Sequence, residues 1–349
     1  MIRQTIHAVR ANKSFIKYAV ILIIAANGLP ALVSYNTPNL SNSDTYAFVI
    51  PYVQKCHVLQ YPQRENYQVI NNATMKYTGD FSPTREPLKW WLNCLSYKTT
   101  GSFKLIPVLF NIGLMPLVYL LTLQFTKDRL VSLISLVAFT SNPLYHDWIA
   151  SGTYDQVWSF FLILSIYILF KSKEWIATPL TLILSMAAKA LTAMYLPAIF
   201  YTIKQTKHDR KTKILASLLC VAAILLVIGY VIEQKVNLVG AATGFYPQNW
   251  HDAAYHNWEM LWPEIPFLMI FTLLSVNFVP VHPSPWRKLC AVWILNALIT
   301  TPVISLFSMQ IQFVYRFVPL AVFMSIFIAI TINDVGKWIV DYKLNRLQK

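Results

Sequence analysis

Long apolar runs, separated by short polar links, follow one another along most of the chain. Each run has about the 20 residues that an α-helix needs to cross a bilayer. The runs lie at 16–35, 104–125, 130–148, 155–171, 213–233, 263–281, 288–308 and 313–333. This pattern predicts an all-α, polytopic transmembrane helical bundle that forms a single domain over residues 1–349.

Composition supports the same conclusion. Hydrophobic residues make up 56% of the chain and charged residues only 13%, whereas a soluble chain carries about 25% charged residues. The net charge of +14 could suggest a nucleic-acid partner, but the Lys and Arg residues fall mostly in short links, without basic tracts interleaved with aromatics. Retention of basic loops in the cytoplasm explains the charge better, so we expect no nucleic-acid partner.

The segment 175–203 decides the topology, because it is long for one crossing and short for two. The basic N-terminus is cytoplasmic by the positive-inside rule, and the first apolar run is expected to be an uncleaved span. A single crossing by 175–203 would put the most basic link, KQTKHDRKTK at 204–213, outside. A hairpin of two short helices with its tip near Lys189 puts that link inside, together with WRK at 286–288 and the basic tail. We therefore expect about ten crossings and both termini in the cytoplasm, in a prokaryotic cell membrane or an ER-type membrane.

Two loops, 36–103 and 234–262, are then extracytoplasmic. They contain the amphipathic, aromatic-rich pieces TYAFVIPYV, PLKWWLNCL and NWHDAAYHNWEMLW. Because Trp and Tyr favour the headgroup level of a membrane, these pieces predict helices that lie on the outer surface. Cys56 and Cys94 share the first loop and would form a disulfide if that loop faces an oxidising compartment.

Two carboxylates stand at the outer ends of predicted spans. Asp44 follows the polar run NTPNLSNS, and Asp155 lies in SGTYDQVWSFF at the start of the fourth span. Either carboxylate could be a helix cap or a favourable charge at a helix start. A capping carboxylate is also fixed in place, so both remain candidates for catalysis.

Two cations are predicted on the same side of the membrane. Lys189 interrupts LSMAAKALTAM, an otherwise uncharged stretch, and an ionisable group at such depth indicates a functional site. Arg316 lies about a turn inside the outer end of the last span, in QIQFVYRFVPLAVF, and a planar guanidinium suits phosphate oxygens. The alternatives are snorkelling of Lys189 to the interface and anchoring of the last helix by Arg316.

Further ionisable groups supply accessory candidates. His146 and Asp147 end the span before Asp155, and His256 and Glu259 lie in the second outer loop. The histidines of HDAAYH are spaced i, i+5, which is not the i, i+4 spacing of a helical zinc pair. Asp44 and Asp155 are the candidates for binding a divalent cation such as Mg²⁺ or Mn²⁺. The chain contains no HExxH, Walker A, GxSxG or post-strand GxGxxG motif.

The order of these motifs resembles that of the GT-C superfamily of integral membrane glycosyltransferases. The similarity rests on SDTYAF, REPLKWWL, SNPLYHDWIASGTYDQ, the Lys-bearing LSMAAKALTAMYLPAIFY and the late YRFVPLAVF. The resemblance implies that Asp44 matches the acidic residue of the first outer loop and Asp155 the second acidic motif. It implies also that Lys189 and Arg316 lie near a carrier phosphate. The chain has no WWDYG motif, so an oligosaccharyltransferase itself is not expected.

The leading hypothesis is a glycosyltransferase that takes a sugar from a polyprenyl-phosphate carrier and passes it to a lipid, glycan or protein acceptor on the extracytoplasmic face. In this hypothesis the carboxylates act on the acceptor hydroxyl or hold the cation, and the two cations stabilise the phosphate leaving group. The alternatives are a carrier or flippase for an anionic lipid or solute, and a non-catalytic subunit with membrane protein partners.

Overall fold

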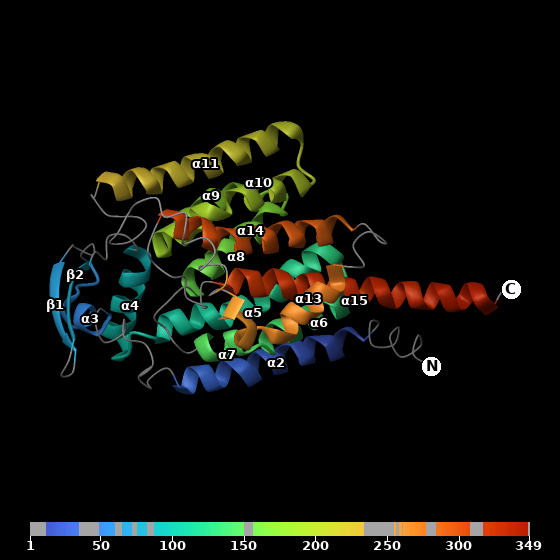
Figure 1. The fold of residues 1–349 in the computed structure, drawn as a ribbon, viewed down its shortest axis with the longest axis horizontal. Coiled ribbons are helices and arrows are strands. Elements are labelled where there is room, and N and C mark those ends of the chain that lie inside the picture. The colour runs from blue at the N-terminus through green and yellow to red at the C-terminus, as the bar shows by residue number, and fades with distance from the viewer. Residues whose placement is uncertain are drawn as a thin grey trace.

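The computed structural model shows an elongated helical bundle with two distinct ends (Figure 1). It describes residues 12–34, 49–59, 65–71, 75–81, 87–149, 156–233, 255, 258–259, 261–276, 284–307 and 317–347. The start of α2 and the end of α15 lie at one end, and a small unit of helices α3 and α4 with strands β1 and β2 covers the other. We call the end covered by this unit the disulfide end. The opposite end, where α2, α6, α11 and α14 begin, is the basic end.

The elements follow one another along the chain in this order: α2 (Lys13–Ser34), α3 (Ile50–Lys55), β1 (Glu65–Asn71), β2 (Met75–Phe81), α4 (Pro87–Thr100), α5 (Leu105–Thr126), α6 (Arg129–Thr140), α7 (Pro143–Ile149), α8 (Gln156–Leu169), the 3₁₀ helix η3 (Glu174–Ala177), α9 (Thr178–Ala188), η4 (Ala190–Tyr195), α10 (Leu196–Gln205), α11 (Arg210–Glu233), α13 (Pro266–Val276), α14 (Pro285–Phe307) and α15 (Val318–Leu347).

Four of the described helices are long and apolar enough to cross a membrane. They span Lys13–Ser34, Leu105–Thr126, Arg210–Tyr230 and Val318–Ile339, and shorter apolar helices accompany them. An apolar helix of at least 18 residues spans the hydrocarbon core at 1.5 Å per residue. The predicted helical membrane architecture is confirmed in this coarser form.

A β-hairpin departs from the all-α prediction. Strands β1 and β2 pair antiparallel, with Glu65 opposite Phe81 and Asn71 opposite Met75. The sequences ENYQVIN and MKYTGDF each carry three β-branched or aromatic residues in seven, and these residue types are enriched in strands. Their short length, between a polar loop and an amphipathic helix, hid this signal beside the much stronger transmembrane runs.

Helix α15 lies at the centre of the bundle. Residues 317–331 are all buried, and α15 packs against α5, α6, α8, α13 and α14. By contrast, α11 exposes Leu218, Leu225 and Leu226. A helix that is apolar all round is buried inside a large protein or a membrane, so α15 is covered by other helices and α11 presents apolar side chains at the surface.

The chain reverses direction within 174–208. At the basic end, the rings of Trp175 and His208 lie 6.0 Å apart, and His208 Nε2 lies 2.8 Å from the carbonyl oxygen of Leu169. At the opposite end of the segment's path, the Ser185 hydroxyl on α9 donates a hydrogen bond to the Trp158 carbonyl oxygen in the first turn of α8. The segment therefore runs from the last turn of α8 to its first turn and back. This is the path that the hairpin interpretation of 175–203 requires.

Asp128 caps the start of α6. Its carboxylate accepts hydrogen bonds from the backbone N–H groups of Leu130 and Val131, at 2.9 and 3.3 Å. Replacing an N-cap Asp with Ala costs about 1 kcal/mol. We expect Asp128→Ala to lower the unfolding free energy in detergent by about that amount, as measured by denaturant titration. Glu233→Ala, which removes an exposed carboxylate, is expected to change it by less than about 0.5 kcal/mol, and an equal loss in both variants would contradict the capping role.

Candidate functional site at the disulfide end

Lys189 occupies the reversal point of the helical hairpin. Helix α9 ends at Ala188, and Lys189 adopts an extended backbone, with φ −158° and ψ 116°, before η4 begins. Its N–H donates to the Ser185 carbonyl at 2.8 Å, and its own carbonyl accepts from Thr192 N at 3.2 Å. Its side chain is buried, at 7% exposure. Burying an ammonium group is costly unless the group is compensated, so the surroundings of this side chain matter for the hairpin tip.

Hydroxyl groups hold the hairpin tip against α8. Ser185 Oγ donates to the carbonyl oxygen of Trp158 at 2.8 Å and lies 2.7 Å from Thr192 Oγ1. All three residues are fully buried. Because Ser185 and Thr192 flank Lys189, these contacts place the turn that carries Lys189 next to the first turn of α8.

A row of aromatic rings joins the tip to two further helices. The ring centroids of Trp158 and Tyr195 lie 5.9 Å apart, those of Tyr195 and Trp293 5.7 Å, and those of Trp293 and Phe323 4.6 Å. Two hydrogen bonds, from Trp293 Nε1 to Thr202 Oγ1 and from Asn296 Nδ2 to the Met194 carbonyl, fix α14 alongside the returning arm of the hairpin.

These contacts place the starts of two helices at the same end of the bundle as Lys189. Helix α8 begins at Gln156, directly before Val157 and Trp158. Helix α15 begins at Val318, five residues before Phe323, which is about 7 Å along a helix. Both helices therefore begin at the end of the bundle that holds the hairpin tip.

Four of the predicted site residues, Asp44, Asp155, Arg316 and His256, lie outside the described residues. In the sequence, Asp155 directly precedes the first residue of α8, and Arg316 directly precedes Phe317. The predicted grouping of Asp44, Asp155 and Arg316 around Lys189 stays a prediction.

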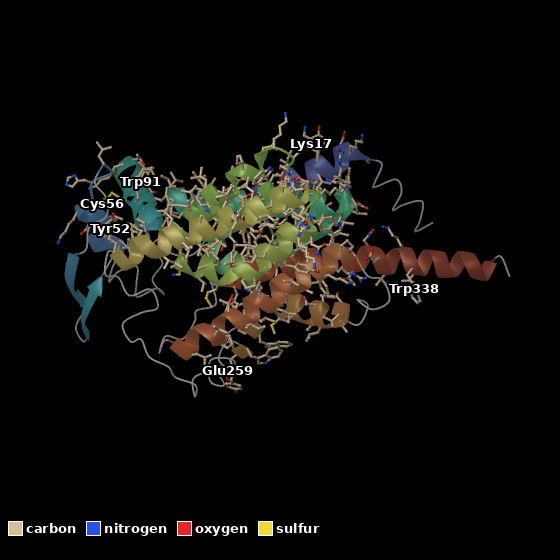
Figure 2. The ribbon with its side chains drawn as sticks, turned by 90° about the horizontal axis from the view of Figure 1, so that it is seen from above. Lys17, Tyr52, Cys56, Trp91, Glu259 and Trp338 are labelled. Atoms are coloured by element: carbon tan, nitrogen blue, oxygen red, sulfur yellow. A yellow bond between two sulfur atoms is a disulfide. The ribbon has the colours of Figure 1, made fainter. Side chains whose placement is uncertain are left out.

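The accessory candidates lie at several places. His146 is exposed on α7, 6.3 Å from the ring of Tyr145; Asp147 belongs to the same helix, but its side chain lies outside the description. Glu259 is exposed at the margin of the molecule (Figure 2). A side-chain hydrogen bond with Glu259, and the negative charge of that carboxylate, raise the pKa of Tyr255 above its ordinary value.

Sequence reasoning missed two buried lysines. Lys89 on α4 is 5% exposed, with Nζ 4.9 Å from the ring centroid of Trp90. Lys104 precedes α5 and is 3% exposed, and burial lowers its pKa below the ordinary value. Helix α4 packs against both α5 and α9, so Lys89, Lys104 and Lys189 all belong to elements that meet at this end. A lysine inside the apolar strings PLKWWL and SFKLIPV was the signal that could have revealed them.

The described residues contain no group of three or more His, Cys, Asp or Glu side chains that could hold a metal ion. The carboxylates predicted to bind Mg²⁺ or Mn²⁺, Asp44 and Asp155, lie outside that part of the chain. Metal binding therefore stays a prediction for these two residues.

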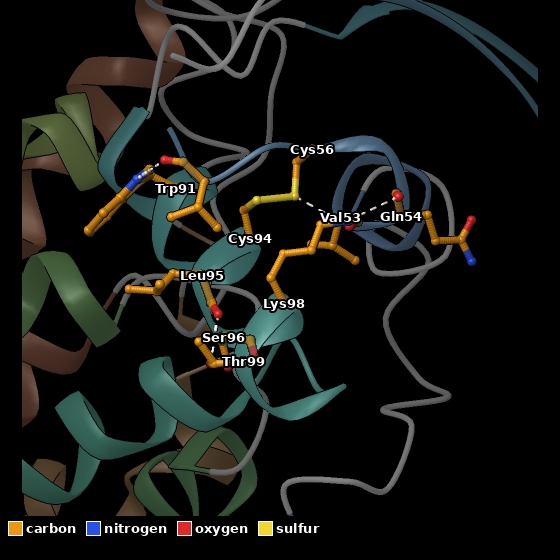
Figure 3. Close-up of a disulfide and its surroundings, with 10 residues drawn as sticks. Val53, Gln54, Cys56, Trp91, Cys94, Leu95, Ser96, Lys98 and Thr99 are labelled. Carbon is orange, nitrogen blue, oxygen red and sulfur yellow. Dashed lines mark hydrogen bonds between the residues drawn. A yellow bond between two sulfur atoms is a disulfide. The ribbon is translucent and has the colours of Figure 1, made fainter. Parts of the chain in front are cut away.

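A disulfide between Cys56 and Cys94 joins α3 to α4, with their Cα atoms 6.1 Å apart (Figure 3). Trp91 Nε1 donates to the Val58 carbonyl at 2.9 Å across the same contact, and the rings of Tyr52 and Trp90 pack edge to face at 5.3 Å. The bond holds the α3–α4 unit together by a covalent link at this end of the molecule.

Comparisons with models of protein families, with curated proteins and with solved structures find no match to this chain.

Proposed function

We propose that the chain is a GT-C-like membrane glycosyltransferase with its active site at the disulfide end. It takes a sugar from a polyprenyl-phosphate carrier lying in the outer leaflet and passes it to a hydroxyl of a lipid, glycan or protein acceptor. The observation that carries the proposal is the buried Lys189 at the tip of a helical hairpin, at the end of the bundle where α8 and α15 begin.

Two independent features support the proposed orientation. The disulfide occupies one end of the bundle, and the Lys- and Arg-rich links, such as 204–213, occupy the other. Positive loops stay in the cytoplasm, and disulfides form outside it. If α9 and α10 each count as one pass, helices α2, α5, α6, α8, α9, α10, α11, α13, α14 and α15 provide the expected ten crossings, with both termini cytoplasmic.

The proposed reaction is a displacement at the anomeric carbon of the donor sugar. Asp44 takes the proton of the acceptor hydroxyl, whose oxygen forms a bond to that carbon. The bond between the carbon and the phosphate oxygen breaks, and its electron pair leaves with the carrier phosphate. Lys189 and Arg316 stabilise the charge that develops on the leaving phosphate. Asp155 assists the base, or would be a ligand for a divalent cation, which would supply positive charge to the same phosphate.

The direct test is transfer of labelled sugar from a panel of polyprenyl-phosphate hexoses and pentoses in proteoliposomes. Wild-type protein is expected to transfer at least one of them to an acceptor in the membrane extract. Asp44→Asn is expected to lower the rate about 100-fold or more, because general-base catalysis contributes 10²–10⁴-fold. Asp209→Asn, which changes an exposed carboxylate at the basic end, is expected to retain the wild-type rate.

Two outcomes would count against the proposal. Transfer by Asp44→Asn at the wild-type rate would remove Asp44 from the reaction. Absence of transfer by wild-type protein with every donor of the panel would argue against a glycosyltransferase and in favour of a carrier or a non-catalytic subunit.

A further inference from the structure

Among the described cations of the basic end, Arg287 is the most completely buried. It lies in the first turn of α14 and has no exposed surface. Its Nε lies 3.6 Å from Asp334 Oδ2 on α15, which is too long for a hydrogen bond. None of its nitrogen atoms, Nε, Nη1 or Nη2, has a hydrogen-bond partner in the part of the chain that the structure describes. A buried guanidinium without acceptors is costly, which calls for a ligand that supplies them.

Local geometry favours an anion at this place. The first N–H groups of a helix have no partners within the helix and carry partial positive charge, and α14 begins at Pro285, just before Arg287. Asp334 is only 21% exposed and faces the Nε edge. Nη1 and Nη2 have no hydrogen-bond acceptor but are covered by neighbouring groups, so a phosphate reaches them only when those groups move aside. A guanidinium fork then matches two oxygens of the phosphate.

Over the whole basic end, which includes Arg287, cationic side chains outnumber carboxylates. The carboxylates of the basic end with described side chains are Asp128, Glu174, Asp209 and Asp334. The cations with described side chains are Lys13, Lys17, Lys127, Arg129, Lys171, Lys173, Lys204, Lys207, Arg210, Lys211, Lys213, Arg287, Lys288 and Lys337. Such a surface attracts anionic lipids of the cytoplasmic leaflet.

The surroundings of Arg287 are amphiphilic, as a lipid requires. Trp286 stacks on Phe125 with ring centroids 4.8 Å apart, and Trp338, 46% exposed, follows Asp334 by one helical turn (Figure 2). Tryptophan prefers the headgroup level, which places Arg287 at that depth. Further along α14, Leu295 and Ile299 are 56% and 51% exposed, so apolar surface extends from the cation toward the membrane interior.

We propose that the basic end binds the phosphodiester of an anionic membrane lipid, with the Nη1 and Nη2 edge of Arg287 donating to the phosphate oxygens. Asp334 stays on the Nε edge and holds the guanidinium in place. Lys288 and Lys337, exposed beside the pair, add positive charge, and the acyl chains lie on the apolar surface of α14. This lipid site lies at the opposite end from Lys189 and does not depend on the proposed transfer reaction.

The test is thermal unfolding of the full chain in detergent with phosphatidylglycerol, with phosphatidylcholine or with inorganic phosphate. A ligand that binds only the folded state raises Tm. Phosphatidylglycerol is expected to raise Tm by about 3 °C or more at saturation, and the other two additions by less than about 1 °C. Arg287→Gln is expected to lose the response, while Arg210→Gln, an exposed arginine at the same end, keeps it.

A second variant keeps the test informative if Arg287→Gln does not fold. Without lipid, Asp334→Asn is expected to have a lower Tm than wild type. Phosphatidylglycerol is expected to raise the Tm of this variant by more than that of wild type, because the phosphate replaces the lost carboxylate. A purely structural ion pair predicts the lower Tm without the larger gain. The lipid assignment is overturned by that result, by equal stabilisation from phosphatidylcholine or inorganic phosphate, or by equal loss in Arg210→Gln.

Discussion

Lys189→Met protein is expected to fold and to transfer sugar at about one hundredth of the wild-type rate or less. Removing one group that stabilises a developing anion costs 10²–10³ in kcat, and Lys189 is a buried cation at the end of the bundle where α8 and α15 begin. Methionine has a similar length, and replacing a buried charge with an apolar side chain often leaves packing intact. The rate is measured in proteoliposomes with the labelled donor, and Tm is measured on the same preparation.

The control is Lys204→Met, which removes a lysine from the last turn of α10 at the basic end. It is expected to transfer at the wild-type rate. If Lys189 served only the architecture of the hairpin, Lys189→Met would change Tm and leave kcat near the wild-type value. That combination would contradict the role of Lys189 in holding the carrier phosphate.

Replacing both Cys56 and Cys94 with serine is expected to cost about 4 kcal/mol of stability at the disulfide end. The bond closes a loop with a sequence separation of 38, and the chain-entropy relation gives a stabilisation of that size for a loop of this length. The loss should appear as faster proteolysis at the unit of α3 and α4, together with a lower Tm. A reducing agent added to wild-type protein is expected to have the same effect.

Cys220→Ser provides the comparison for this experiment, because Cys220 is buried on α11 and forms no disulfide. It is expected to alter Tm without exposing the α3–α4 unit to protease. Equal proteolysis of wild-type and double-serine proteins would show that the Tyr52–Trp90 and Trp91–Val58 contacts hold the unit together without the covalent bond.

The helical path near Lys189 could be anticipated from charge alone. The basic link 204–213 fits the cytoplasmic side only if 175–203 reverses, and the structure shows that reversal with Lys189 at its turn. The hydrogen bond between the Ser185 and Thr192 hydroxyl groups could not be anticipated, because such contacts depend on tertiary packing and not on hydrophobic periodicity.

The burial of Lys89 and Lys104 could not be predicted for a different reason. A lysine at the edge of an apolar run ordinarily extends its ammonium group to water, so the sequence alone does not indicate that either side chain is buried. Their burial arises because α4 packs over α5 and α9, which is a long-range arrangement. The β-hairpin was missed because its short strands gave less signal than the neighbouring transmembrane runs.

The central position of α15 has a consequence for how the protein is made. α15 is synthesised after α5, α6, α8, α13 and α14, yet its buried side chains from Phe317 to Thr331 pack among them. The earlier helices therefore enter the membrane before their common packing partner exists. Assembly must either wait for α15 or proceed through a looser bundle into which α15 inserts, so ribosome-bound chains that lack α15 should be more accessible to protease than the released protein.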